Sequence, residues 1–175
     1  MLYYWFVIRM SGGPALYGHR RVGRHGTAFT CYKFRTMVVD AGAVLDAHLA
    51  ANAEAAAEWR RDFKLRHDPR VTRIGGFLRR TSLDELPQLW NVIKGEMSLV
   101  GPRPVIAAEL DRYGPFLRCY LDARPGITGL WQVTARQSDD FEERAELDLA
   151  YIDRWSLWLD AKILLRTIPA ALEGR

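Results

Sequence analysis

The sequence contains few of the residues that build disulfide frameworks or zinc sites. Only two of its 175 residues are cysteine, Cys31 and Cys119, and neither has a partner at a metal-ligand spacing. The four histidines are scattered, with no HExxH-type pairing: His19, His25, His48 and His67. These absences argue against a disulfide-stapled or zinc-bound fold and indicate a reducing, cytosolic setting.

Long apolar runs are also missing. Met1–Ile8 is nearly all apolar or aromatic, but Arg9 ends this run well short of the about 20 residues that cross a bilayer. It lacks the basic n-region and small-residue cleavage site of a secretory signal. Residues 1–16 are therefore interpreted either as a buried N-terminal element or as the remnant of a segment that dips into a membrane.

Composition favours one globular domain with an anionic partner. Hydrophobic residues make up 49% of the chain, and the net charge of +4 with a pI near 9.3 suits nucleic acid, a phosphorylated small molecule or an acidic membrane surface. Arginine dominates the basic residues, and its planar fork binds phosphate in a bidentate manner. Phosphate recognition is thus the favoured interpretation.

The first half of the chain reads as a hairpin followed by helices. Residues 17–37 predict a β-hairpin that turns at residues 24–26, and residues 38–66 predict one long exposed helix. Thr72 can cap a short helix that ends at Arg80. A further helix is expected from about Asp84 to Gly95, with Pro87 in its first turn.

The second half predicts more helices and one short strand. Helical stretches are expected over residues 105–121, a strand over 127–133, and helices over 140–155 and 157–172. No repeat or linker divides the chain. The expected fold class is a compact, mainly helical α+β single domain with a small hairpin or sheet and amphipathic helices.

Adjacent carboxylates at a predicted helix start are the first chemical candidates. Asp84 and Glu85 follow Arg79, and Arg103 lies on a loop that Pro102 and Pro104 stiffen. A helix N-terminus stabilises carboxylates and attracts phosphate, although acidic residues there often serve only as caps. A structural role therefore stays open on this pattern alone.

Three sequence blocks resemble the bacterial sugar transferase family, the monotopic polyprenol phosphate phosphoglycosyl transferases. The blocks are KFRTM at residues 33–37, RRTSLDELPQLWNVIKGEMSLVGPRP at 79–104 and RPGITGLWQV at 124–133. The resemblance implies that residues 17–175 form a catalytic domain. Its reaction would move a sugar 1-phosphate from a UDP-sugar to undecaprenyl phosphate and release UMP, initiating exopolysaccharide or O-antigen synthesis.

The resemblance also implies roles for single residues. Asp84 would be the nucleophile that forms an aspartyl-phosphosugar intermediate, and Glu85 would help Asp84 to hold Mg²⁺. The phosphate or nucleotide pocket would be lined by arginines and one lysine: Arg79, Arg103, Arg136, Lys33 and Arg35. For Lys33 and Arg35, substrate contact and a purely structural role both stay open.

The implied partners are a UDP-sugar, a polyprenol phosphate and the lipid surface at the cytoplasmic face of the bacterial inner membrane, with no nucleic acid. The identity of the sugar and the formation of a homo-oligomer stay open. A rival interpretation is a non-catalytic basic module that binds lipid headgroups or nucleic acid. A second rival keeps the reaction but lets the lipid phosphate attack the donor directly.

Overall fold

The computed structural model describes residues 12–62, 65–135 and 140–172, so Met1–Ile8 and Arg136 lie outside the described residues. The predicted hairpin is confirmed. Strand β1 (Leu16–Val22) pairs antiparallel with β2 (Ala28–Phe34), and the 3₁₀ turn η1 (Arg24–Gly26) joins them. His25 and Gly26 adopt positive φ angles of 58° and 75°, which closes the turn tightly.

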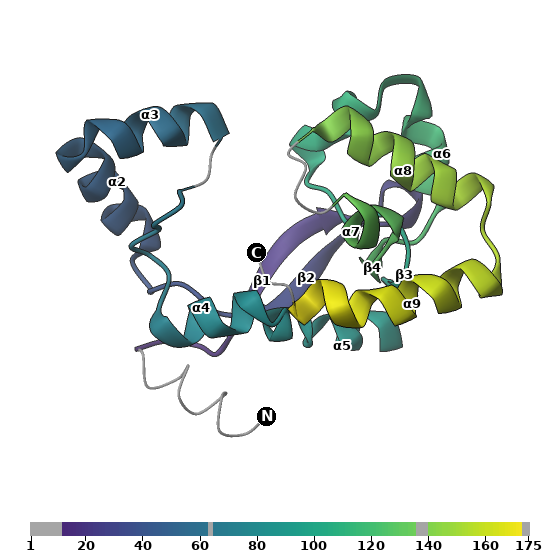
Figure 1. Cartoon of the computed structure of the whole chain (residues 1–175), viewed down its shortest axis with the longest axis horizontal. Coiled ribbons are helices and arrows are strands. Elements are labelled where there is room, and N and C mark those ends of the chain that lie inside the picture. The colour runs from purple at the N-terminus through teal and green to yellow at the C-terminus, as the bar shows by residue number, and fades with distance from the viewer. Residues whose placement is uncertain (1–11, 63–64, 136–139, 173–175) are drawn as a thin grey trace.

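The predicted single helix over residues 38–66 is wrong. The chain instead forms α2 (Ala41–Ala51) and α3 (Ala53–Asp62), and Asn52 between them has extended angles of φ −137° and ψ 104°. The Asn52 side-chain oxygen accepts a hydrogen bond from the Ala55 amide at 3.0 Å, which caps α3. Asparagine favours such local bonds over helix continuation, and the two helices form an arm to one side of the molecule (Figure 1).

Helix α4 (Arg73–Arg80) begins as expected, because the Thr72 hydroxyl accepts a hydrogen bond from the Gly75 amide at 3.0 Å. The helix that was expected to start near Asp84 starts later. Residues Leu83–Glu85 form a single 3₁₀ turn, η2, and α5 spans Gln88–Ile93. Pro87 has no amide to donate to Leu83, so the Leu86 amide bonds the Leu83 carbonyl instead, at 3.3 Å.

Helix α5 is fastened to the hairpin by the fully buried Asn91. Its amide nitrogen donates to the Thr30 carbonyl at 2.7 Å, and its oxygen accepts from the Tyr32 amide at 3.1 Å. Asn91 therefore occupies the free edge of β2 as another strand would. Gly95 ends the α5 segment with a φ of 75°, as the sequence predicted.

A second small sheet joins β3 (Ser98–Val100) to β4 (Gly126–Thr128) in parallel. The strand predicted over 127–133 is therefore mostly wrong, because residues 130–134 form helix α7 (Leu130–Thr134). Short apolar runs do not separate a strand from a buried helix. Here Leu130 and Val133, three residues apart, pack on the same cluster as Ile163.

The remaining elements are helical, as expected. They are η3 (Ala107–Phe116), α6 (Leu117–Asp122), α8 (Phe141–Asp153) and α9 (Leu157–Leu172). Gly114 interrupts η3 with a φ of 50°, and the Asp140 side chain caps α8 through the Glu142 amide at 2.8 Å. The α+β, mainly helical fold class is confirmed.

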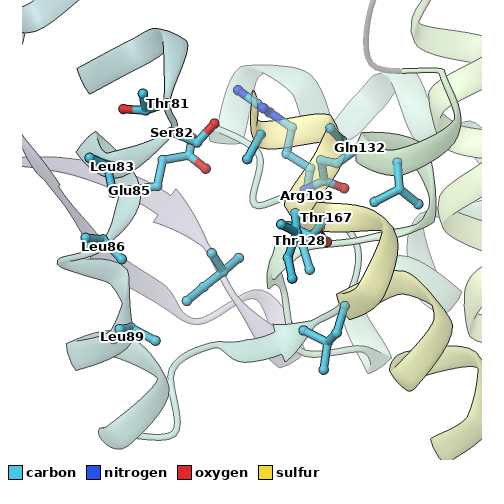
Figure 2. A pocket seen from close by; sticks show the side chains of 16 residues that line it. Thr81, Ser82, Leu83, Glu85, Leu86, Leu89, Arg103, Thr128, Gln132 and Thr167 are labelled. Carbon is cyan, nitrogen blue, oxygen red and sulfur yellow. Dashed lines mark hydrogen bonds between the residues drawn. The ribbon is translucent and has the colours of Figure 1, made fainter. Parts of the chain in front are cut away.

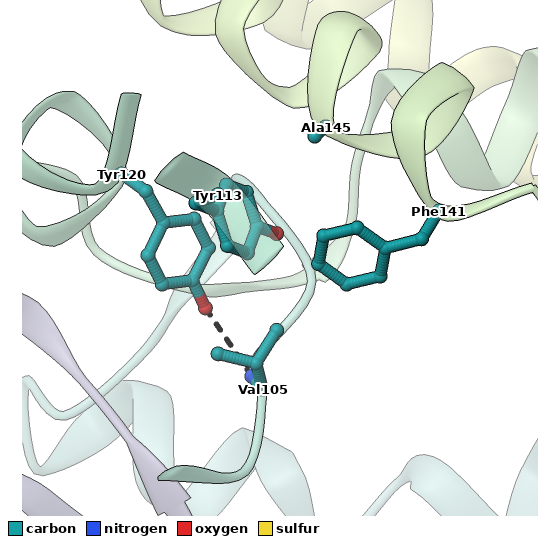
Figure 3. Close-up of a cluster of buried hydrophobic side chains, with 5 residues drawn as sticks. All are labelled: Val105, Tyr113, Tyr120, Phe141 and Ala145. Carbon is teal, nitrogen blue, oxygen red and sulfur yellow. Dashed lines mark hydrogen bonds between the residues drawn. The ribbon is translucent and has the colours of Figure 1, made fainter. Parts of the chain in front are cut away.

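One core cluster packs around the loop that follows β3. Tyr113 stacks at a tilt on Tyr120 with ring centroids 4.3 Å apart and meets Phe141 edge-on at 5.1 Å. The Tyr120 hydroxyl accepts from the Val105 amide at 3.2 Å (Figure 3) and donates to the Arg103 carbonyl at 2.9 Å. This cluster fixes the backbone on both sides of Pro104.

Large apolar side chains are exposed on α5 and α9, which run along the same side of the molecule (Figure 1). They are Leu89, Trp90 and Ile93 on α5, and Leu157, Trp158, Leu164, Leu165 and Ile168 on α9. Among the residues that the structure describes, none of the helices combines the length and apolar character needed to cross a bilayer.

Candidate active site

A cavity of about 490 Å³ lies between η2 and α5 on one side and β4, α7 and α9 on the other (Figure 2). Its lining residues are Thr81, Ser82, Leu83, Glu85, Leu86, Leu89, Arg103, Ile127, Thr128, Gln132, Val133, Leu164, Thr167, Ile168, Ala170 and Ala171. Two of the predicted site residues, Glu85 and Arg103, are in this set. They reach the cavity from opposite walls (Figure 2).

Glu85 is held by the hairpin. Lys33 at the end of β2 donates a hydrogen bond from Nζ to Oε1 of Glu85 at 2.7 Å, and both side chains are partly buried. A charge-assisted bond of this length orients the carboxylate strongly. Substrate contact and a purely structural role were both left open for Lys33. The structure shows that Lys33 contacts Glu85.

Asp84 lies beside Glu85 in the same 3₁₀ turn and is buried, with 6% of its surface exposed. Ser82 just before it has a left-handed φ of 54°, which non-glycine residues rarely adopt. Strain of this kind gathers at functional turns. The predicted setting of Asp84 at the mouth of an α-helix is nevertheless wrong, because η2 is a single 3₁₀ turn.

Arg103 is positioned by the packing of its loop. Its guanidinium carbon lies 5.7 Å from the centre of the Trp131 ring, and Tyr120 binds its carbonyl. Gly101 in this loop and Gly126 in β4 allow the two segments to pack closely. A Cβ on either glycine would overlap the backbone of the other segment. The predicted rigid presentation of this arginine agrees with these contacts.

A buried polar network beneath Arg103 was missed in the sequence. The Tyr113 hydroxyl donates to Oδ2 of Asp148 at 3.1 Å, and Arg144 lies 3.9 Å from the same oxygen. Burial raises the pKa of Asp148 to about 7, opposed by Arg144, by Tyr113 and by a hydrogen bond from the Arg103 backbone. The signal in the sequence for this network was the spacing of Arg144 and Asp148, which lie four residues apart on one helix.

Of the other predicted phosphate ligands within the described residues, Arg79, Arg35 and Lys33 do not line the cavity. Arg79 donates from Nε to the Thr36 hydroxyl at 2.8 Å. The Arg35 guanidinium lies against Gly13, just beyond the end of the hairpin at which β1 begins and β2 ends. Thr36, Gln132, Thr128 and Thr167 were not predicted, although the first three lie inside the sequence blocks quoted above.

The carboxylates of Asp84 and Glu85 are hard oxygen donors on adjacent residues, as Mg²⁺ prefers. Within the described residues no group of three or more His, Cys, Asp and Glu side chains could hold a metal. Mg²⁺ commonly completes its shell with water and substrate phosphate oxygens, so two carboxylates fit such an ion.

Comparisons with known proteins agree with the blocks quoted above. The model of the family described as "Bacterial sugar transferase" matches residues 1–174. An "Uncharacterized sugar transferase" of Haemophilus influenzae is 55% identical, and the "Undecaprenyl-phosphate galactose phosphotransferase" of Salmonella typhimurium is 54% identical, each over 98% of this chain and 36% of the relative. The "Exopolysaccharide production protein ExoY" of Rhizobium meliloti is 49% identical over 94% of this chain and 73% of the relative. The chain thus spans about a third of the length of the first two relatives.

Proposed function

The chain belongs to the bacterial sugar transferase family, and from this premise we propose that it transfers a sugar 1-phosphate from a UDP-sugar to a polyprenol phosphate. The observation that carries the proposal is the placement of Glu85 and Arg103 on one cavity, with Asp84 beside Glu85. The Salmonella relative's name specifies undecaprenyl phosphate and galactose, and a Caulobacter vibrioides relative, 42% identical, is named for UDP-glucose and undecaprenyl phosphate.

The proposed chemistry has two displacements at one phosphorus. A carboxylate oxygen of Asp84 attacks the β-phosphorus of the UDP-sugar, the bond from that phosphorus to the bridging oxygen breaks, and UMP leaves with the bridging oxygen. A phosphate oxygen of the polyprenol phosphate then attacks the same phosphorus. The aspartyl bond breaks, which regenerates the Asp84 carboxylate and yields the polyprenyl diphosphosugar.

The surrounding charges serve these steps. Mg²⁺ held by Asp84 and Glu85 would neutralise the diphosphate oxygens and so make the phosphorus accessible to an anionic nucleophile. Arg103 binds phosphate oxygens in the cavity, and Lys33 holds Glu85 in position. Arg79 and Arg136 are proposed to add positive charge around the phosphates.

The proposed location is the cytoplasmic face of the inner membrane. The exposed leucine, isoleucine and tryptophan side chains of α5 and α9 suit the interface between headgroups and acyl chains. A polyprenol phosphate keeps its own phosphate at that depth. An enzyme lying on the surface would therefore meet the acceptor where its charged end is.

A test follows from the covalent intermediate. We expect Asp84→Asn to abolish UMP release from UDP-sugars while the circular dichroism spectrum stays unchanged, because the amide cannot attack phosphorus. Asp111→Asn, an exposed aspartate of η3, is the matched control and should keep full activity. Turnover at the normal rate in Asp84→Asn would overturn the aspartyl mechanism.

Two further measurements separate the rivals. UMP released by the unaltered chain without any acceptor, in an amount equal to the enzyme, supports the covalent route; release only in the presence of acceptor supports direct attack. Loss of activity in EDTA with recovery on adding Mg²⁺ is expected, and full activity in EDTA would remove the metal from the proposal. Binding of generic RNA with no UMP release from any UDP-sugar would favour the non-catalytic alternative.

A further inference from the structure

The cavity has a polar end and an apolar end. Glu85 and Arg103 lie at one end, and Leu86 and Leu89 line the wall toward the other (Figure 2). Most of the remaining surface is hydrocarbon, contributed by Leu83, Ile127, Val133, Leu164, Ile168, Ala170 and Ala171. A ligand that fills this space must combine a charged group with an apolar body.

The threonines of the lining add little polarity, because their hydroxyl hydrogens are already used. The Thr128 and Thr167 hydroxyls bond each other at 2.8 Å, and Thr167 also reaches the Ile163 carbonyl at 2.8 Å. Thr81 donates to the Phe77 carbonyl at 2.9 Å. Besides Glu85, Arg103, Ser82 and Gln132, the lining therefore offers few groups that bond the hydroxyls of a sugar or the edge of a base.

The apolar end opens onto the exposed side of α5 and α9. Leu89 and Ile168 line the cavity yet keep 43% and 63% of their surfaces exposed. On the same helices, Ile93 and Leu165 are 74% and 70% exposed but do not line it. Leu89 and Ile168 thus belong both to the cavity wall and to the exposed apolar surface of α5 and α9.

We infer that this cavity binds the acceptor: the phosphate of a polyprenol phosphate lies at Arg103, and its first isoprene units run along the leucine and isoleucine walls toward the membrane. The inference rests on the proposed function and assigns one substrate to the cavity. Charge complementarity places the phosphate at Arg103, across the cavity from Glu85 and the neighbouring nucleophile Asp84. Burial of the first isoprene units removes apolar surface of both ligand and wall from water.

The test uses two matched pairs of variants in the full chain, dispersed in detergent. Ile168→Ser and Leu89→Ser each remove a side chain of the cavity wall, one from α9 and one from α5. Leu165→Ser and Ile93→Ser remove exposed side chains of the same helices outside the cavity. Both members of a pair lose apolar surface, so a general loss of lipid or detergent affinity affects both alike.

KM is measured separately for undecaprenyl phosphate and for the UDP-sugar that the unaltered chain uses. We expect each wall variant to raise the acceptor KM to about tenfold that of its paired control, with the donor KM the same in both. The same ratio is expected with farnesyl phosphate, because only the first isoprene units touch the wall. Thermal unfolding of each variant confirms that the fold is retained.

Three results would overturn the inference. A raised KM for the UDP-sugar would assign the cavity to the donor, an unchanged acceptor KM would show that the wall is not used, and equal effects in wall and control variants would show general lipid affinity. The proposed function fails in a different way, since the unaltered chain would then release no UMP from any UDP-sugar.

Discussion

Nζ of Lys33 lies 2.7 Å from Oε1 of Glu85, and this contact joins the end of β2 to η2 across 52 positions of sequence. The hairpin is itself bound to the loop after Arg103, because the Val22 amide donates to the Val105 carbonyl at 2.9 Å. The two walls of the cavity that carry Glu85 and Arg103 are therefore attached to one scaffold. Their separation depends on the hairpin as well as on local geometry.

Replacing Lys33 should impair the reaction more than the fold. We expect Lys33→Met to lower kcat by at least about tenfold, because Glu85 loses the ammonium that orients it. The free energy of unfolding should fall by only about 1 kcal/mol, since the pair is partly screened by solvent. Rates of UMP release and urea unfolding measure the two effects.

Lys94→Met provides the matched control. Lys94 and Glu96 form an ion pair of 2.6 Å with the same residue types, more exposed and away from the cavity lining. The control should keep the unaltered rate. A rate for Lys33→Met equal to that of Lys94→Met would show that the β2 contact does not orient a catalytic carboxylate.

The close packing of α4 on Thr36 leads to a second prediction. A Cβ on Gly75 would overlap the Thr36 carbonyl, whereas a Cβ on Gly76 would come no nearer than 4.0 Å to Val71. Gly75→Ala should therefore push α4 away and break the bond from Arg79 to Thr36, with a loss on the order of 2 kcal/mol in unfolding free energy and lower turnover. Gly76→Ala should raise the unfolding free energy by about 0.5–1 kcal/mol.

Thermal unfolding and UMP release on both variants check this prediction. The two substitutions add the same methyl group to neighbouring positions of one helix, so helix propensity changes equally. Equal stability of the two proteins would mean that α4 moves without cost and that Thr36 does not determine where Arg79 lies.

Local signals in the sequence predicted most helix ends and the hairpin. Thr72, Gly95 and Asp140 each act through their own backbone neighbours, so their effects could be read without the tertiary structure. Asn52 and Pro87 also act locally, but each competed with a strong helical pattern. The side-chain hydrogen bond of Asn52 and the missing amide of Pro87 outweighed that pattern.

The polar contacts of the site depend on long-range packing instead. The sequence blocks singled out Glu85, Lys33 and Arg103 as site residues, but not that Lys33 bonds Glu85 or that Arg103 faces it across a cavity. Asp148 was missed because only the packing of α8 shows that this acid is buried. Periodicity in one helix does not show which neighbouring helix covers it.

Asp148 makes the stability of the chain depend on pH in a specific window. Burial raises its pKa to about 7, whereas an aspartate in the unfolded chain titrates near 4. Between those values the folded chain holds a proton that the unfolded chain has lost. Raising the pH through this window therefore lowers the free energy of unfolding, and the loss is complete above about pH 7.

Asp148→Asn should remove this part of the pH dependence, because the amide stays neutral and can still accept the bond from Tyr113. Urea unfolding at several values between about pH 4.5 and about pH 7.5 gives the free-energy difference between variant and unaltered chain. We expect this difference to shift in favour of Asp148→Asn as the pH rises, by on the order of a few kcal/mol in total. Asp153→Asn, on the exposed side of the same helix, should follow the unaltered chain throughout. A difference for Asp148→Asn that stays constant with pH would show that Asp148 is ionised in the folded state across the whole range, with Arg144 as its stabilising counter-ion.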